Sequence, residues 1–88
     1  MELVFLRSFI QDFKATREPA VRRKVERAVK QLQQAVSLKD IPNLRKLEGY
    51  RNAYRIRIGD HRIGFLLVDG KIELQRLANR RDIYRSFP

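Results

Sequence analysis

The chain has 88 residues, enough for one folded domain and too few for two, so we expect a single domain over residues 1–88. It contains no cysteine, which excludes disulfide bonds and thiolate metal ligands and argues against a small secreted protein. Twenty lysines and arginines against 10 acidic residues give a formal charge of +10, which favours nucleic acid or an acidic protein as partner.

The start of the chain predicts a short strand followed by a short helix. Residues 2–6 are mostly apolar and fit a buried strand, and the basic Arg7 that follows, without a small-residue cleavage site, argues against a signal peptide. No apolar run approaches the roughly twenty residues of a membrane span, so we expect a cytoplasmic protein with no membrane contact. Ser8, with Gln11 three residues later, matches a capping box and predicts a helix over residues 8–17.

A second helix is predicted from Pro19 onward, because proline suits the first turn of a helix. Apolar side chains then recur at helical spacing: Val21, Val25, Ala28, Val29, Leu32 and Val36. The opposite face of the same stretch is largely charged. A stripe this regular indicates a helix that packs by one face against the rest of the domain.

The remainder of the chain predicts a loop, three strands and a tail. Residues 37–52 show no periodicity and read as a mobile connection. The strand-like runs are residues 53–58, 61–68 and 71–78. Gly59-Asp60 and Asp69-Gly70 separate them, and both pairs suit tight hairpin turns. The basic tail, residues 79–88, is expected to form about one helical turn.

This order of elements predicts the α+β class with a βααβββ topology. An antiparallel-rich small sheet with both helices on one face buries the apolar stripes most economically, and the short basic tail follows it.

Arginines are predicted to gather on one face of this sheet. Side chains alternate along a strand, so Arg55 and Arg57 share the face opposite the apolar residues between them. On the next strand, Arg62 and Gly64 fall on that same face if the tight turn sets the register. A glycine there would leave room for a ligand to approach. The pattern therefore predicts a basic concavity.

The tail adds Arg80, Arg81 and Arg85, with Tyr84 among them. Arginine forks bind phosphate through two hydrogen bonds, and a tyrosine can stack on a base, so this mixture suits RNA. Taken singly, each residue has a plainer explanation, since exposed arginines mostly stay solvated and terminal tyrosines mostly pack. Their convergence from three segments favours a site.

These residues carry a resemblance to a known family. Its marks are Leu47-Glu48-Gly49, the run Tyr54-Arg55-Ile56-Arg57-Ile58-Gly59-Asp60-His61-Arg62-Ile63-Gly64-Phe65, and Asn79-Arg80-Arg81-Asp82-Ile83-Tyr84 with the closing Phe87-Pro88. In this order they resemble the consensus of the RelE/ParE toxin superfamily over the whole chain. The resemblance implies a βααβββ toxin that needs no metal or cofactor, enters the ribosomal A site, cuts mRNA and is held in check by an acidic antitoxin.

The resemblance also implies roles for single residues. Four are expected to be catalytic, namely Arg57, Arg62, Arg80 and Tyr84. Arg57 orients the strand and stabilises charge, and Arg62 clamps the scissile phosphate. Arg80 neutralises the developing charge or assists the leaving oxygen, and Tyr84 positions the nucleotide. The residues expected to bind mRNA and the ribosome are Arg45, Lys46, Arg55, Arg81 and Arg85.

The general base is left open. Relatives with a lysine at the positions of Arg55 or Arg57 have a group that can lose its proton, whereas the arginine guanidinium keeps its proton near neutrality. His61 is the only histidine, but its strand parity puts it with the buried set, away from the arginines.

Two other functions remain open at this point. A ParE-like toxin would poison DNA gyrase, but members of that branch lack the arginine and tyrosine cluster. A non-catalytic basic module would bind nucleic acid through its sheet. The cluster of Arg62, Arg80 and Tyr84 favours the ribonuclease over the ParE-like toxin, and a search for cut mRNA on translating ribosomes would separate the ribonuclease from the binding module.

Overall fold

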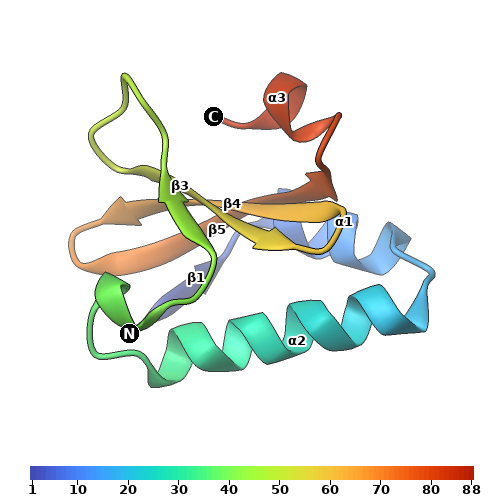
Figure 1. Ribbon diagram of the computed structural model, residues 1–88, viewed down its shortest axis with the longest axis horizontal. Coiled ribbons are helices and arrows are strands. Elements are labelled where there is room, and N and C mark those ends of the chain that lie inside the picture. The colour runs from blue at the N-terminus through green and yellow to red at the C-terminus, as the bar shows by residue number, and fades with distance from the viewer.

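The computed structural model describes all of residues 1–88 and places a five-stranded sheet between two helices on one side and a short helix on the other (Figure 1). The elements are β1 (Leu3–Phe5), α1 (Arg7–Ala15), α2 (Pro19–Gln34), the 3₁₀ turn η1 (Leu38–Asp40), β2 (Leu44–Lys46), β3 (Ala53–Ile58), β4 (His61–Val68), β5 (Lys71–Asn79) and α3 (Ile83–Ser86). The sheet order is β1-β5-β4-β3-β2, and only the β1–β5 pair is parallel. The predicted α+β class and antiparallel-rich sheet are confirmed.

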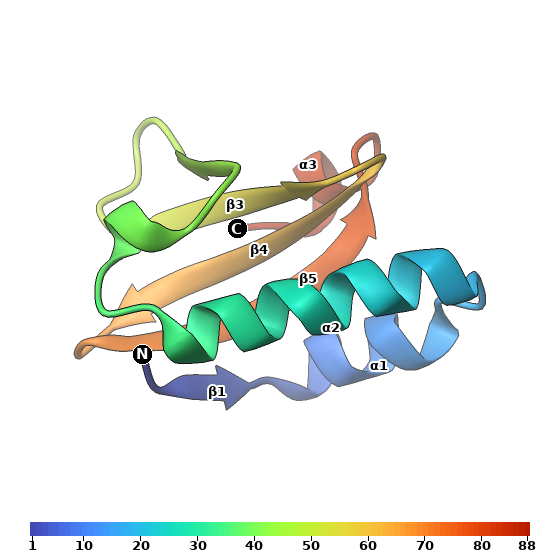
Figure 2. The same ribbon diagram turned by 60° about the horizontal axis from the view of Figure 1, so that its bottom comes forward.

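The larger core lies between the sheet and the helices α1 and α2, which run along the same face (Figure 2). It consists of Phe9, Val25, Ala28, Leu32, Ile41, Ile56, Ile58, Ile63, Phe65, Ile72, Leu74 and Leu77. Burying each large apolar side chain contributes about 1.5–3 kcal/mol relative to leaving it in water. The stripe predicted for the second helix accounts for its inward face.

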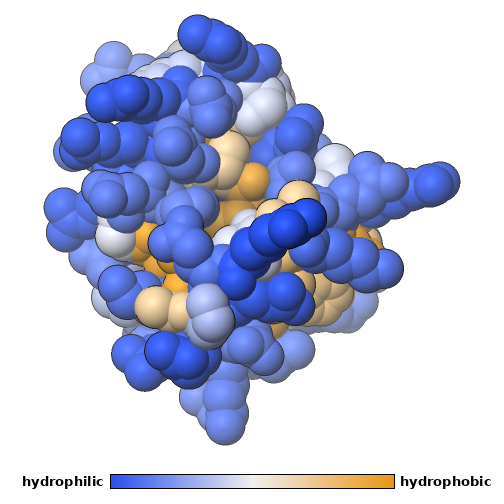
Figure 3. Space-filling model, turned by 90° about the vertical axis from the view of Figure 1, so that its right-hand side faces the viewer, coloured by the Kyte–Doolittle hydropathy of each residue, from blue (hydrophilic) through white to orange (hydrophobic).

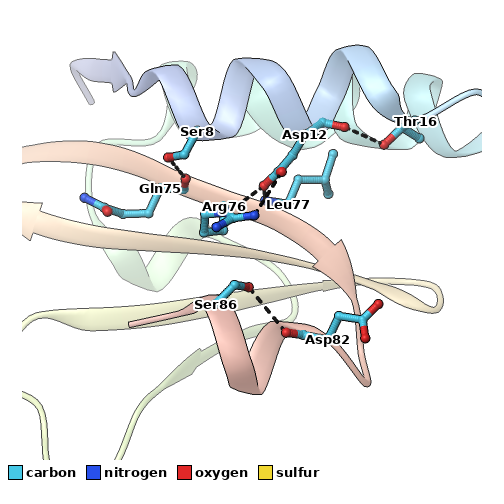
Figure 4. A network of polar contacts seen from close by, with 8 residues as sticks. All are labelled: Ser8, Asp12, Thr16, Gln75, Arg76, Leu77, Asp82 and Ser86. Carbon is cyan, nitrogen blue, oxygen red and sulfur yellow. Dashed lines mark hydrogen bonds and ion pairs between the residues drawn. The ribbon is translucent and has the colours of Figure 1, made fainter.

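A polar contact fixes α1 on β5 (Figure 4). The Asp12 carboxylate accepts hydrogen bonds from Arg76 Nε at 2.8 Å and Nη2 at 3.1 Å, and from the Leu77 backbone N–H at 2.9 Å. The hydrogen bond to Asp12 raises the pKa of Arg76 above its ordinary value. One carboxylate thus joins the helix to both the backbone and a side chain of the strand.

Two details of the predicted helices are wrong. The capping box of Ser8 and Gln11 does not form, because α1 begins one residue earlier and its N-cap is Leu6. The Ser8 hydroxyl instead donates to the Gln75 carbonyl on β5, so a tertiary contact replaces the local one. The second helix ends at Gln34, which leaves Val36 outside it and 90% exposed.

The segment predicted to be an unstructured connection, residues 37–52, holds both η1 and the edge strand β2. β2 pairs antiparallel with β3, with Leu44 opposite Ile56 and Arg45 opposite Arg55. Three residues are too few to show an alternation of apolar and polar side chains, so the sequence pattern did not indicate this strand.

A smaller core lies on the sheet face opposite the two long helices. Ala53, Ile83 and Phe87 are buried there, under α3 and the end of the chain. A Cβ atom added at Gly64 would lie 2.5 Å from the Phe87 ring. The prediction that Gly64 leaves room for a ligand is therefore wrong, because the Phe87 ring occupies that space. None of the three helices has the length and apolar character needed to cross a membrane.

Candidate functional site

A hollow of about 370 Å³ opens on the sheet face opposite α1 and α2, beside the smaller core. We call it the arginine concavity, and its lining consists of Asn43, Leu44, Arg45, Arg55, Arg57, Arg62 and Tyr84. These residues come from β2, β3, β4, α3 and the residue before β2. The structure thus gathers four arginines and a tyrosine from segments far apart in the chain.

Strand register explains why the arginines meet. Arg57 lies opposite Arg62 on β4, and Arg55 lies between Arg45 on β2 and Gly64 on β4. Directly opposed side chains on one face of an antiparallel pair stand about 4.5–5.5 Å apart at Cβ. The alternation read from the sequence and the tight turn at Gly59-Asp60 produce this register.

Neutral groups hold three of these guanidinium groups in place. Arg62 Nη1 donates to the carbonyl oxygens of Gly59 at 2.8 Å and His61 at 2.9 Å. Arg57 Nη2 donates to Asn43 Oδ1 at 3.4 Å. The Arg55 guanidinium lies over the Tyr84 ring, 4.8 Å from its centroid.

No carboxylate neutralises these arginines. The ion pairs of the chain are Lys71 with Glu2 and Arg76 with Asp12, and neither lies in the arginine concavity. Four like charges on one face repel one another, so the site is suited to an anion that supplies the missing counter-charge. Arginine's planar fork fits the oxygens of a phosphate.

Tyr84 adds an aromatic surface to this basic site. Its side chain is 73% exposed although its neighbour Ile83 is fully buried. The buried Ile83 fixes α3 on the sheet, so the ring is presented at a defined place beside Arg55. An exposed ring next to phosphate-binding groups can stack on a nucleobase.

His61 does not line the arginine concavity. It lies opposite Ile58 at the start of β4, and the residues of the same parity, Ile58 and Ile63, belong to the larger core. No group of histidine and acidic side chains that could hold a metal ion is present in the chain.

Four predicted site residues lie outside the arginine concavity. Lys46 follows Arg45 and pairs with Tyr54, so alternation directs it to the other face of β2. Arg80 is exposed, and its backbone N–H donates to the Asp60 carbonyl at 2.8 Å, in the turn that Arg62 also contacts. Arg81 and Arg85 are exposed in the tail. Through this shared turn, the Arg80 backbone lies at the rim of the arginine concavity.

Two lining residues, Asn43 and Leu44, were not singled out from the sequence. Asn43 has a φ of 60°, a left-handed conformation that asparagine tolerates better than most residues. The Pro42-Asn43 pair was the available signal, because proline and asparagine mark turns. It indicated a turn but not its position beside the arginines.

The fold and the site together define a small basic α+β domain with an arginine-lined surface suited to an anion. No family model matches the chain. Toxin RelE3 of Methanocaldococcus jannaschii is 33% identical to this chain. The alignment has 89 positions and covers the full length of both proteins. The chain belongs to the RelE toxin family.

Solved structures agree with this membership. The RelB-RelE antitoxin-toxin complex from Methanococcus jannaschii matches with a TM-score of 0.81 and 30% identity, over 97% of this chain and 99% of that one. The archaeal RelE-RelB complex from Pyrococcus horikoshii OT3 matches with a TM-score of 0.71 and 20% identity, over 90% and 93%. The intact E. coli RelBE complex has a TM-score of 0.69 at 15% identity, over 89% and 94%. The last two show a shared fold alone.

Proposed function

We propose that the chain is the toxin of a type II toxin–antitoxin system and that it cuts mRNA on the ribosome without a metal ion. The observation that carries the proposal is the gathering of Arg45, Arg55, Arg57, Arg62 and Tyr84 with no carboxylate among them. Membership of the RelE family supports the toxin class.

In the proposed reaction the ribose 2′-hydroxyl attacks the neighbouring phosphorus, and the bond from phosphorus to the 5′-oxygen breaks. Arg62 clamps the scissile phosphate, and Arg57 stabilises the charge that builds on its oxygens. Arg80 reaches in from the rim toward the leaving oxygen. Because arginine does not give up its proton near neutrality, we assign the proton of the 2′-hydroxyl to water, and water also supplies the proton that the leaving 5′-oxygen takes up.

Binding is divided among the remaining cations. Arg45 and Arg55 line the arginine concavity and hold the message. Arg81 and Arg85, which are exposed in the tail, and Lys46, which is exposed on the other face of β2, contact ribosomal RNA in this proposal. Tyr84 stacks on a nucleobase while Arg55 covers its other side.

An acidic antitoxin is the proposed protein partner. The three solved structures reported above are described as complexes of RelE with RelB, two of them as toxin–antitoxin complexes. A chain of charge +10 has the complementary sign for an acidic protein, and such a partner would also cover the arginines until it is removed.

The direct test is single-turnover cleavage of a message on programmed ribosomes, mapped by primer extension, with a DNA gyrase assay alongside. We expect cuts in the translated message and no effect on gyrase. Gyrase inhibition without cleavage would instead support a ParE-like toxin. Tight RNA binding with neither activity would support a non-catalytic binding module.

A further inference from the structure

A second basic hollow, of about 310 Å³, lies between α2 and β3. We call it the α2–β3 groove. α2 contributes Lys24, Arg27 and Gln31 to its lining, and Asn43 and Arg57 line both this groove and the arginine concavity. The two hollows are therefore contiguous although they lie on opposite faces of β3.

The short length of β2 explains how the hollows meet. The β2–β3 ladder ends where Leu44 pairs with Ile56, and beyond it a single backbone hydrogen bond of 3.1 Å joins the Arg57 N–H to the Asn43 carbonyl. Ile58 and Gly59 have no partner strand on that side. Beyond the Asn43–Arg57 contacts no strand therefore separates the arginine concavity from the α2–β3 groove.

The charges of the α2–β3 groove are also free of protein counter-charges. Its lining contains Lys24, Arg27 and Arg57 and no acidic residue, and neither Lys24 nor Arg27 forms an ion pair. Lys24 extends across to the β3–β4 turn, where its Nζ lies 3.6 Å from the place of a Cβ on Gly59. The hollow on the other side of α2 also contains three cations, Lys14, Arg22 and Lys30, but most of its lining is apolar and it includes the acidic Glu26.

We propose that an RNA strand leaving the arginine concavity continues past Asn43 and Arg57 into the α2–β3 groove, where Lys24 and Arg27 bind its phosphates. This inference rests on the proposed function and extends its binding site by a second segment. It assigns a role to the exposed basic side of α2 that borders β3, which the reaction itself does not use. Substrate length then becomes a determinant of affinity.

The test compares Lys24→Gln/Arg27→Gln with the matched variant Arg17→Gln/Arg23→Gln, which removes two exposed charges outside both hollows. The probes are 2′-O-methyl oligoribonucleotides, which cannot be cut. One has about three nucleotides, fewer than a typical single-strand site, and the other has about nine, within the span of such sites. In Lys24→Gln/Arg27→Gln, the loss of two phosphate contacts should reduce the slope of log K against log salt concentration by about 1.4 for the longer probe. At moderate salt this corresponds to a loss of affinity on the order of tenfold.

For the shorter probe, which the arginine concavity alone can hold, we expect the affinity of Lys24→Gln/Arg27→Gln to match that of Arg17→Gln/Arg23→Gln. Equal losses for both probe lengths, or an equal loss in both variants, would overturn the extended path. Circular dichroism establishes that each variant is folded.

Binding to ribosomes identifies the source of the strand. A loss confined to ribosomes carrying a message in the A site identifies mRNA in the α2–β3 groove, and an equal loss on vacant ribosomes identifies ribosomal RNA. No loss on either kind of ribosome would overturn the inference. If the parental protein bound RNA in a length-dependent way but cut no message, the proposed function would be wrong. The proposed RNA site in the α2–β3 groove would still be supported.

Discussion

The two faces of the sheet differ in how many apolar residues they bury and in whether their charges are neutralised. The face toward α1 and α2 is closed by a continuous core of twelve buried apolar residues and is fixed by one satisfied carboxylate, Asp12. The opposite face has a core of three buried residues beside four arginines that have no acidic partner. Hydrophilic residues also dominate the side of the molecule shown in Figure 3, with smaller hydrophobic areas between them. Stability is therefore concentrated on the first face, which allows the second to keep unneutralised charge.

The largest expected effect concerns Arg57 and Arg62 on the second face. Replacing either by alanine removes an interaction that strengthens as charge develops on the phosphate, so single-turnover cleavage should fall by roughly a hundredfold or more. Thermal unfolding should change little, because neither side chain contributes to a core.

Arg80→Ala tests the rim position and should reduce cleavage less than Arg62→Ala does. The reference variant is Arg23→Ala, an exposed residue of α2 that lies outside both hollows. Parental rates for both Arg57→Ala and Arg62→Ala would show that the arginine concavity is not the active site.

Gly64→Ala should destabilise the second face although it adds only one methyl group. The new methyl group would meet the Phe87 ring at 2.5 Å, and overpacking of this kind costs up to about 3 kcal/mol. Chemical denaturation measures the loss. In the background of Phe87→Ala the same substitution should cost much less, because the ring it meets is gone. An unchanged cost in that background would show that the strain has another origin.

Asp12→Ala tests the first face and should reduce stability by about 2 kcal/mol, because Arg76 and the Leu77 N–H lose a charged acceptor. Glu2→Ala breaks the exposed pair with Lys71 and should cost less than about 0.5 kcal/mol. Equal costs for the two variants would contradict the assignment of Asp12 as an anchor.

The Asp12–Arg76 pair also has an expected pH dependence. A group whose folded pKa is raised contributes stability that is complete below its unfolded pKa and is lost as pH rises through the folded pKa. Because pairing raises the already high pKa of Arg76, its contribution should stay constant through neutral and mildly alkaline pH. Urea unfolding of the parental protein and of Asp12→Ala across that range measures the difference.

On both faces, the sequence predicts features that depend on local patterns better than features that depend on distant contacts. Period-two alternation and the turns at Gly59-Asp60 and Asp69-Gly70 specify the bounds of β3 and β4, and with them the shared face of Arg55, Arg57 and Arg62. Such patterns are local, and the residues that make them lie next to one another in the chain. The register of the arginines was therefore predictable.

What could not be predicted depends on contacts between distant segments. Ser8 has the sequence of a capping residue, but β5 offers its hydroxyl a different acceptor. Gly64 appears open in the strand pattern, and only the return of the chain end brings Phe87 over it. The placement of Asn43 beside the arginines likewise depends on pairing between β2 and β3. The local sequence patterns that predict helices, strands and turns contain no information on these tertiary contacts.

The smallest expected effect is that of Tyr84→Phe. The Tyr84 hydroxyl makes no hydrogen bond within the chain. The Arg55 guanidinium, however, lies over the Tyr84 ring, 4.8 Å from the ring centroid. Phenylalanine keeps the ring and the stacking surface, so cleavage on programmed ribosomes should stay within about threefold of the parental rate. Tyr84→Ala removes both and should weaken RNA binding by more, since stacking contributes about 1–3 kcal/mol per base. If the cleavage rate of Tyr84→Phe fell by more than about tenfold, the Tyr84 hydroxyl would transfer a proton in the reaction. The proton of the ribose 2′-hydroxyl would then no longer be assigned to water.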